Sequence, residues 1–248
     1  MTPSWISAFL DFAARDFERG VVFWAEVTGY DVSSPRGDDE EFATLVPRVG
    51  DDYLRVQQLR SGRSRLHLDL HVTDPRAAAD RAVELGAVEV AAPDEQGYVV
   101  VTSPAGLTLC FVSHPAARRP PAATWRGGGR SAVDQVCLDI APSVFERECA
   151  FWEQITGWTS EPARLPQFRR LHGPETFALR FLLQRTDTEG PVGAHLDLAA
   201  SDRAAEVARH EKLGATVERV EEFWTVLRDP AGSRYCVTHR DPHDGART

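Results

Sequence analysis

The sequence predicts an α+β protein built from four βαβββ units, arranged as two tandem domains with curved mixed sheets. The first observation is a repeat: residues 8–30 align with residues 136–158 without a gap, and ten of the 23 positions are identical. The second is that the same offset of 128 residues aligns 67–87 with 195–215. The third is that, within each copy, strand-like alternation gives way to helical spacing twice.

The first unit begins with a strand at 7–13, where the two sides of the strand alternate along the chain. Apolar residues then recur at helical spacing from Phe17, and Gly29 is placed to end this helix in a left-handed turn. Residues 42–46 and 53–59 have the composition of short strands. One β-α-β-β sequence of elements is therefore complete before residue 60.

The pattern starts again at residues 66–72, "LHLDLHV". Asp74 followed by Pro75 predicts an N-cap with proline at the first helical position, and Gly86 predicts the end of that helix. Three further strands are predicted within 87–92, 97–102 and 107–112, the last two joined by the turn "SPAG". The repeat predicts the same order of elements in the second copy.

Alternation assigns the side chains of the 66–72 strand to two faces. Leu68 and Leu70 face the helix, whereas His67, Asp69 and His71 face the other side, which forms a cleft if the sheet curls. The same parity and the repeat place further polar residues on this side: Asp11, Asp139, His195 and Asp197.

The two copies are separated by residues 114–134, whose prolines and triple glycine are typical of an exposed connector. The predicted organisation is a first domain at 1–114, a linker at 115–133, a second domain at 134–241 and a disordered tail at 242–248.

Composition narrows the functional classes. The 248 residues are 42% hydrophobic and 26% charged, which is typical of globular proteins, and no apolar run is long enough for a membrane span. The first residues lack a basic segment ahead of the apolar ones, so we expect a cytoplasmic protein. The 28 basic and 37 acidic residues give a net charge of −9, which argues against nucleic acid. The cysteines show no CxxC spacing and are expected to be reduced and buried: Cys110, Cys137, Cys149 and Cys236.

Three motifs recur in both copies: "FERxxxFWxxxTG", "HLDL" before a helix ending in "LGA", and "PAG" before a last strand. Together they resemble the vicinal oxygen chelate superfamily, which includes glyoxalases, bleomycin-resistance proteins and extradiol dioxygenases, and within it the glyoxalase-like subgroup. The resemblance implies divalent-metal ligands on the cleft side. It assigns the first-strand position to Ser7 and Gln135, the second position to His67 and His195, and the last-strand position to Cys110 and Cys236.

Metal-binding members of the superfamily carry a glutamate in that last strand. Cysteine there removes a negative charge and an oxygen donor together, so we expect no complete metal site and no required cofactor. If a divalent metal such as zinc, nickel, manganese or iron binds, the resemblance assigns it to Gln135, His195 and Cys236.

Two readings of the inward acids stay open. In the catalytic reading, His67 with Asp69, and His195 with Asp197, form acid–base or ligand-orienting pairs. In the structural reading, each aspartate accepts hydrogen bonds from a neighbouring strand or from an arginine such as Arg19 or Arg147. Candidate ligand-binding residues are Asp11, His71, Cys110, Asp139 and Trp224.

The predicted function is binding of a small apolar or amphipathic metabolite in a concave cleft. Two alternatives remain: a divalent-metal-dependent lyase, isomerase or dioxygenase, and an antibiotic-sequestering protein of the bleomycin-resistance type. The expected partner is a small molecule, with no nucleic acid and no membrane. The chain is expected to be a monomer that forms an internal pseudo-dimer, or a homodimer.

Overall fold

The computed structural model describes residues 2–92 and 97–242, and the tail predicted at 242–248 lies, except for Pro242, outside this part of the chain. The strands of the first half are β1 (Trp5–Ala13), β2 (Asp31–Val32), β3 (Phe42–Val46), β4 (Leu54–Leu59), β5 (Arg65–His71), β6 (Val88–Ala91), β7 (Val99–Thr102) and β8 (Thr108–Val112). The strands of the second half are β9 (Ala123–Thr124), β10 (Arg130–Ile140), β11 (Thr159–Pro162), β12 (Phe168–His172), β13 (Arg180–Arg185), β14 (Gly193–Ala200), β15 (Thr216–Val220), β16 (Trp224–Arg228) and β17 (Arg234–Thr238). The α-helices are α1 (Phe17–Thr28), α2 (Pro75–Glu84), α3 (Phe145–Thr156) and α4 (Arg203–Lys212), and short 3₁₀ turns at Ala14–Asp16 and Pro142–Val144 precede α1 and α3.

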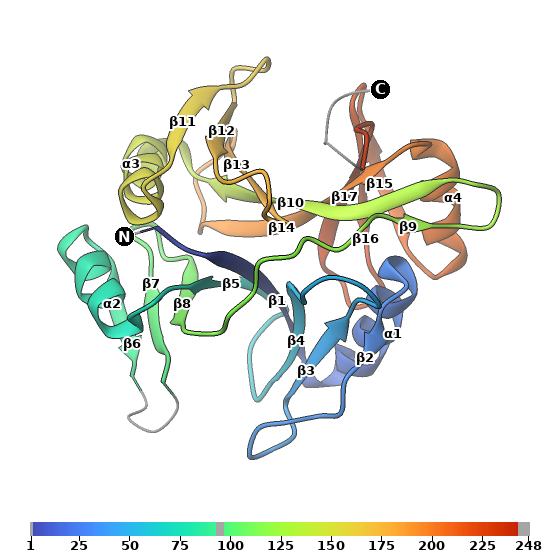
Figure 1. Ribbon diagram of the computed structural model, residues 1–248. Helices are drawn as coiled ribbons and strands as arrows, with labels where there is room; N and C mark the ends of the chain where they lie inside the picture. The colour runs from blue at the N-terminus through green and yellow to red at the C-terminus, as the bar shows by residue number, and fades with distance from the viewer. Residues whose placement is uncertain (1, 93–96, 243–248) are drawn as a thin grey trace. The chain divides into compact units, whose positions relative to one another are not determined.

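These elements repeat β-α-β-β-β four times, which confirms the predicted α+β fold (Figure 1). Among the described residues, the first two repeats form a mixed sheet in the order β2-β3-β4-β1-β5-β8-β7-β6. The last two form a second sheet in the matching order β11-β12-β13-β10-β14-β17-β16-β15, with β9 paired to β10. The strands that carry the "HLDL" motifs, β5 and β14, therefore stand in the middle of their sheets.

The helix ends follow the local chemistry that the sequence predicts. The Asp74 carboxylate accepts a hydrogen bond from the backbone N–H of Ala77 at 3.0 Å, and Pro75 fills the first turn of α2. Gly29 ends α1 with φ of 69°, and Gly157 ends α3 with φ of 72°. This left-handed conformation favours glycine because it has no Cβ.

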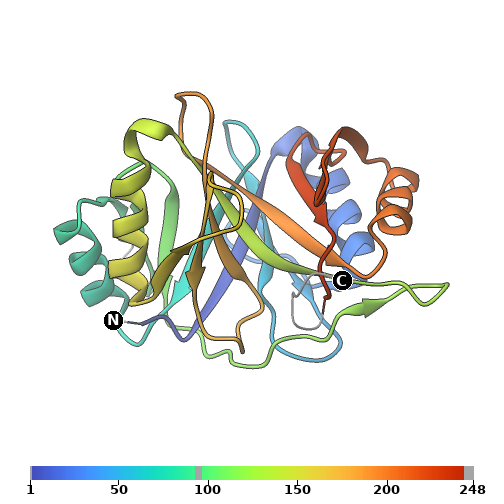
Figure 2. The same cartoon turned by 90° about the horizontal axis from the view of Figure 1, so that it is seen from above.

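The chain divides into two compact units, each made of parts of both sequence copies. Unit 1 comprises Met1–Phe9, Leu66–Arg118 and Val136–Ala194, and unit 2 comprises Leu10–Arg65, Arg119–Gln135 and His195–Thr248. Within unit 1, α2 and α3 lie side by side, and within unit 2, α1 and α4 do (Figures 1 and 2). The boundaries predicted for the two domains stay a prediction.

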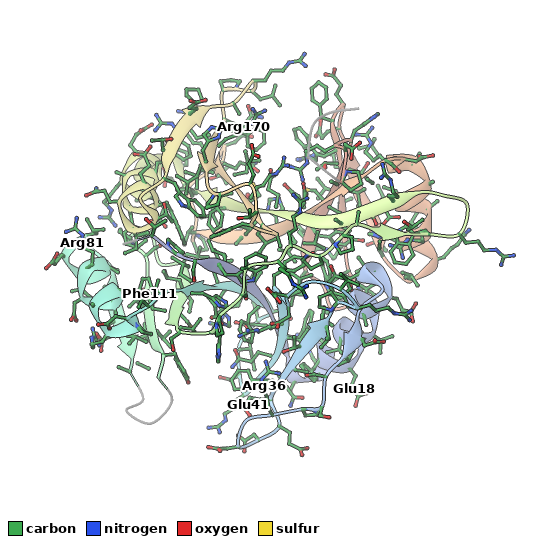
Figure 3. The ribbon with its side chains drawn as sticks, viewed as in Figure 1. Glu18, Arg36, Glu41, Arg81, Phe111 and Arg170 are labelled. Atoms are coloured by element: carbon green, nitrogen blue, oxygen red, sulfur yellow. The ribbon has the colours of Figure 1, made fainter. Side chains whose placement is uncertain are left out.

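The interior is rich in aromatic side chains, with Trp5, Trp24, Trp152 and Tyr235 fully buried. None of the four cysteines forms a disulfide, and all four are buried, as predicted. Charged side chains such as those of Glu18, Arg81 and Arg170 are exposed and point away from the ribbon (Figure 3). No helix among the described residues has both the length and the apolar character that a membrane crossing requires.

Candidate functional site

In unit 1, β5 and β8 bring together a histidine, an aspartate and a cysteine. The two strands run parallel with Asp69 beside Cys110, and His67 Nε2 lies 3.8 Å from Asp69 Oδ1. One ligand atom from each of the three residues lies within 4.8 Å of the others. His67, Asp69 and Cys110 therefore share one face of the sheet, as alternation predicts, and all three are buried. We call them the first trio.

Two residues of β1 contact this face. The Phe9 ring stacks on the His67 imidazole with centroids 4.5 Å apart and an interplanar angle of 10°. Ser7 Oγ lies 2.9 Å from His71 Nε2, and His71 Nδ1 lies 2.8 Å from the carbonyl oxygen of His114. A carbonyl only accepts, so His71 Nδ1 carries a proton and donates it to the His114 carbonyl oxygen. His71, a predicted ligand-binding residue, is thus held inside the protein.

Asp11 is fully buried, and its Oδ2 accepts a charged hydrogen bond from Arg65 Nε at 3.1 Å. The arginine partner is Arg65 and not Arg19, which pairs with Asp16 instead. Arg147, the other arginine expected to pair with an inward aspartate, donates to the carbonyl oxygen of Pro104. An ionised carboxylate at this depth requires such a partner, which favours the structural reading for Asp11.

Unit 2 holds the second trio, which consists of His195, Asp197 and Cys236. Asp197 in β14 stands beside Cys236 in the parallel strand β17, and His195 Nε2 lies 3.4 Å from Asp197 Oδ1. One ligand atom of each again lies within 4.8 Å of the others. The Asp197 side chain is 5% exposed, and its Oδ1 is buried without a hydrogen-bond partner. An orphaned carboxylate oxygen in a protein interior is rare and requires an explanation.

Two hydrogen bonds connect the second trio to residues outside it. Gln135 Nε2 donates to Asp197 Oδ2 at 2.5 Å, and Gln135 Oε1 accepts from an Arg240 guanidinium nitrogen at 2.5 Å. Arg240 also forms an ion pair with Asp134. Both polar atoms of Gln135, the predicted first-strand metal ligand, are therefore hydrogen-bonded within the protein.

The cluster holds two acids, Asp134 and Asp197, one arginine, Arg240, and the imidazole of His195, whose Nε2 lies 3.4 Å from Asp197 Oδ1. Burial raises the pKa of the Cys236 thiol, the Asp197 carboxylate raises it further, and His195 acts in the opposite direction. A cation beside Asp197 Oδ1 would give this buried carboxylate oxygen a partner.

Trp224 lies on the same face as the second trio. In the antiparallel pair of β16 and β17, Val226 stands opposite Cys236 and Trp224 opposite Thr238. Directly opposite residues point to the same side, and so do residues two apart. The partly exposed Trp224 ring therefore shares the Cys236 side of the sheet. Asp139, on β10, is also partly exposed.

A small hollow of about 10 Å³ lies elsewhere in unit 2 and is lined by Tyr30, Tyr53, Ser131 and Leu198, among others. Leu198 alternates with Asp197 along β14, so this hollow is on the opposite face of the strand from the second trio. The tyrosine hydroxyls there lie 3.4 Å apart, and Tyr53 donates to the carbonyl of Val133. None of the residues that line this hollow is an acid, a cysteine or a histidine.

Sequence reasoning missed Asp134 and Arg240. Asp134 precedes the predicted first-strand position, and Arg240 follows the last predicted strand. A signal was present in the repeat, because Ala199 replaces His71 and Arg240 replaces His114 in the second copy. In the first copy His71 and His114 are in contact, and in the second copy one becomes alanine and the other arginine. This paired change indicates that the polar contacts of the second copy are arranged differently.

Comparisons with known proteins place the chain by sequence and by structure. A family model described as "Glyoxalase-like domain" matches residues 7–112 and 135–238. A search of curated proteins found no match. Among solved structures, a Mn(II)-bound glyoxalase from Novosphingobium aromaticivorans aligns with a TM-score of 0.67 and 16% identity, covering 99% of this chain and 84% of that chain.

Two further solved structures share the fold. A mutant of 4-hydroxymandelate synthase from Streptomyces coelicolor has a TM-score of 0.63 and 19% identity, covering 100% of this chain and 95% of that chain. A 2,2',3-trihydroxybiphenyl 1,2-dioxygenase from Sphingomonas wittichii has a TM-score of 0.61 and 16% identity, with coverages of 96% and 90%. At these identities the likeness to solved structures shows a shared fold and no more. By its two matched segments, the chain belongs to the glyoxalase-like domain family as a tandem pair of such domains.

Proposed function

We propose that this chain is a metal-dependent glyoxalase-like protein in which His195, Asp197 and Cys236 hold a transition-metal ion next to a binding site for a small oxygen-bearing molecule. The single observation that carries the proposal is Asp197 Oδ1, which is buried and orphaned 3.4 Å from His195 Nε2. A tetrahedral zinc ion with bonds of roughly 2.0–2.2 Å separates its nitrogen and oxygen ligands by about 3.3–3.6 Å. The spacing and the missing partner both fit a cation between these atoms.

The donor set favours zinc over harder metals. Imidazole and carboxylate suit several divalent ions, but a cysteine thiolate selects zinc or another soft ion over manganese or magnesium. The glyoxalase from Novosphingobium aromaticivorans is Mn(II)-bound, so the expected metal here differs because of Cys236. When bound by three protein ligands, such an ion keeps an open position and supplies Lewis acidity to a substrate oxygen.

The residues around the trio support a role in binding a small molecule. Gln135 holds Asp197 Oδ2, so that only Oδ1 remains directed to the site. Trp224 offers an aromatic surface on the same side of the sheet, which suits the apolar part of an amphipathic ligand. The prediction of a small apolar or amphipathic ligand is therefore compatible with a metal-centred site.

The test is a titration of chelator-treated protein with Co²⁺, which takes zinc sites and gives a visible charge-transfer absorption when a thiolate binds it. We expect this absorption to saturate with bound Co²⁺, and protein purified without chelator to contain zinc by elemental analysis. Cys236→Ser and His195→Ala should abolish the absorption. Cys110→Ser, the matched change in the first trio, should retain it.

Failure of Co²⁺ to bind the unmodified protein would overturn the proposal. The result would instead favour the function predicted from the sequence, which is binding of a small molecule without a metal. Loss of the absorption in Cys110→Ser, with retention in Cys236→Ser, would overturn its assignment to the second trio.

A further inference from the structure

One end of the second trio is connected to an arginine that no part of the family resemblance includes. Arg240 follows β17, and its guanidinium contacts both Asp134 and Gln135 in β10. Gln135 in turn contacts Asp197 in β14. We propose that Arg240 is a positioning residue that acts through Gln135 to fix Asp197 for cation binding. This inference rests on the proposed metal function.

The direction of these hydrogen bonds follows from the donor inventory alone. A guanidinium has five N–H donors and no acceptor, so the Gln135 atom that faces Arg240 must be the oxygen. The amide nitrogen is therefore the atom that faces Asp197, and it donates to Oδ2 at 2.5 Å. Without Arg240, the Gln135 amide could rotate by half a turn and place its oxygen against the Asp197 carboxylate. The two oxygen atoms would then repel each other. Arg240 thus determines which Gln135 atom faces Asp197.

Fixing Asp197 Oδ2 also fixes the direction of Oδ1. The carboxylate is planar, so a hydrogen bond to one oxygen sets the plane in which the other oxygen lies. In this arrangement Oδ1 is directed towards His195 Nε2, at 3.4 Å, and has no hydrogen-bond partner. Ligand orientation by such outer partners is a general property of metal sites, and losing one typically weakens metal binding about 10–100-fold.

The first copy provides an internal comparison, because it has the same trio but other residues at the positions of Gln135 and Arg240. Ser7 stands at the position of Gln135, and its hydroxyl is hydrogen-bonded to His71. His114 stands at the position of Arg240, and its carbonyl accepts from His71. The relay of Arg240, Gln135 and Asp197 therefore belongs to the second copy, and we expect the second trio to bind cations more tightly than the first.

The surroundings of Arg240 are consistent with a fixed side chain. The Arg240 side chain is 14% exposed and the Asp134 side chain 1% exposed. Their ion pair holds the guanidinium in one place, so that its second nitrogen can face Gln135. Lysine cannot reproduce this geometry, because its ammonium is a single point charge and the two acceptors are on different residues.

The experiment has one arm without metal and one with Co²⁺. Replacing Arg240 alone leaves Asp134 buried without a cation and could unfold the protein, so Arg240→Met is combined with Asp134→Asn. Arg240→Lys is the conservative variant, and His114→Met is the matched change in the first copy. Thermal unfolding by circular dichroism confirms that each variant is folded.

The metal-free arm follows the side-chain amide of Gln135 by ¹⁵N NMR. In the unmodified protein we expect two separate, slowly exchanging amide protons, because the group is buried and held at both ends. In the double variant we expect faster exchange and a changed chemical shift. An unchanged Gln135 signal would overturn the relay whether or not the protein binds metal.

In the Co²⁺ arm, we expect binding about 10–100-fold weaker in the double variant, an intermediate loss in Arg240→Lys and no change in His114→Met. Unchanged Co²⁺ affinity alongside a changed Gln135 signal would overturn the claim that the relay serves the metal site. Absence of Co²⁺ binding in the unmodified protein would overturn the proposed function. It would also overturn the proposal that Arg240 positions Asp197 for cation binding.

Discussion

The indole Nε1 of Trp24 in α1 donates a hydrogen bond to Asp229 Oδ2 at 2.9 Å across 205 residues of sequence. Asp229 opens the turn before β17, and its other oxygen accepts from the backbone N–H of Ser233. In unit 1, the equivalent Trp152 donates at 2.9 Å to Glu148 in its own helix. Each unit thus satisfies a buried indole with a carboxylate, but the carboxylate comes from a different element.

Removing either carboxylate is expected to destabilise the fold. Asp229→Ala leaves the Trp24 N–H buried without a partner, and Glu148→Ala does the same to Trp152. Each change should lower the free energy of unfolding by about 1–3 kcal/mol. Urea denaturation followed by circular dichroism measures this, with the exposed Asp80→Ala as control. Asp229→Ala protein as stable as the unmodified chain would contradict the role of this hydrogen bond.

The two units differ here because position 20 requires glycine. A Cβ on Gly20 would lie 2.7 Å from the Phe12 ring, so the helix cannot carry a glutamate at the position where α3 has Glu148. Gly20→Ala should therefore destabilise the protein by about 1–3 kcal/mol, although alanine favours helices. The same denaturation assay applies, and Gly190→Ala, which meets open space, should be nearly neutral. Stabilisation by Gly20→Ala would refute the steric argument.

A buried polar network in α4 predicts a specific acid sensitivity. Burial alone raises the pKa of Glu206, but hydrogen bonds from His210, Arg209 and Ser131 outweigh it and lower the pKa from 4.5 to about 2. The folded state then binds fewer protons than the unfolded state between these values, so stability falls as pH decreases from about 4.5 towards about 2.

Glu206→Gln should remove this part of the pH dependence and also lower stability at neutral pH, because Arg209 and His210 lose a charged partner. Denaturation midpoints of both proteins, measured from pH 2 to pH 7, test the prediction. Parallel curves over the whole range would show that Glu206 does not contribute. The first copy has Ala78 and Ala82 at the equivalent positions of α2, so this acid-sensitive element belongs to unit 2.

The sequence predicted the parts of this structure that depend on local rules. Alternation placed His67, Asp69 and Cys110 on one face, and the repeat carried the same arrangement to the second trio. It did not predict β9 or β2, because two residues are too few to show a period. The contact of Arg240 with Gln135 depends on where the chain turns after β17, which no local pattern encodes.

The connector also departs from the sequence-based expectation, since Trp125 is anchored within it. Its ring centroid lies 3.7 Å from the Arg209 guanidinium carbon, its Nε1 donates to Ser131 Oγ at 2.8 Å, and its edge covers Gly29. Trp125→Ala removes all three contacts, whereas Trp125→Phe keeps an aromatic face for Arg209 and loses the hydrogen bond.

We expect trypsin to cleave the connector after Arg126 or Arg130 faster in Trp125→Ala than in the unmodified protein, with Trp125→Phe in between. Release of the ring frees the segment around these arginines, and proteolysis follows the population of such open states. The loss of stability should be roughly 2 kcal/mol, because both the cation–π contact and the partly buried hydrogen bond are lost. Lys212, in the last turn of α4, gives a reference cleavage site whose rate should change only with global unfolding. Equal cleavage of the connector in all three proteins would mean that the Trp125 ring does not hold the connector in place. Any lower stability of Trp125→Ala would then have to arise within α4.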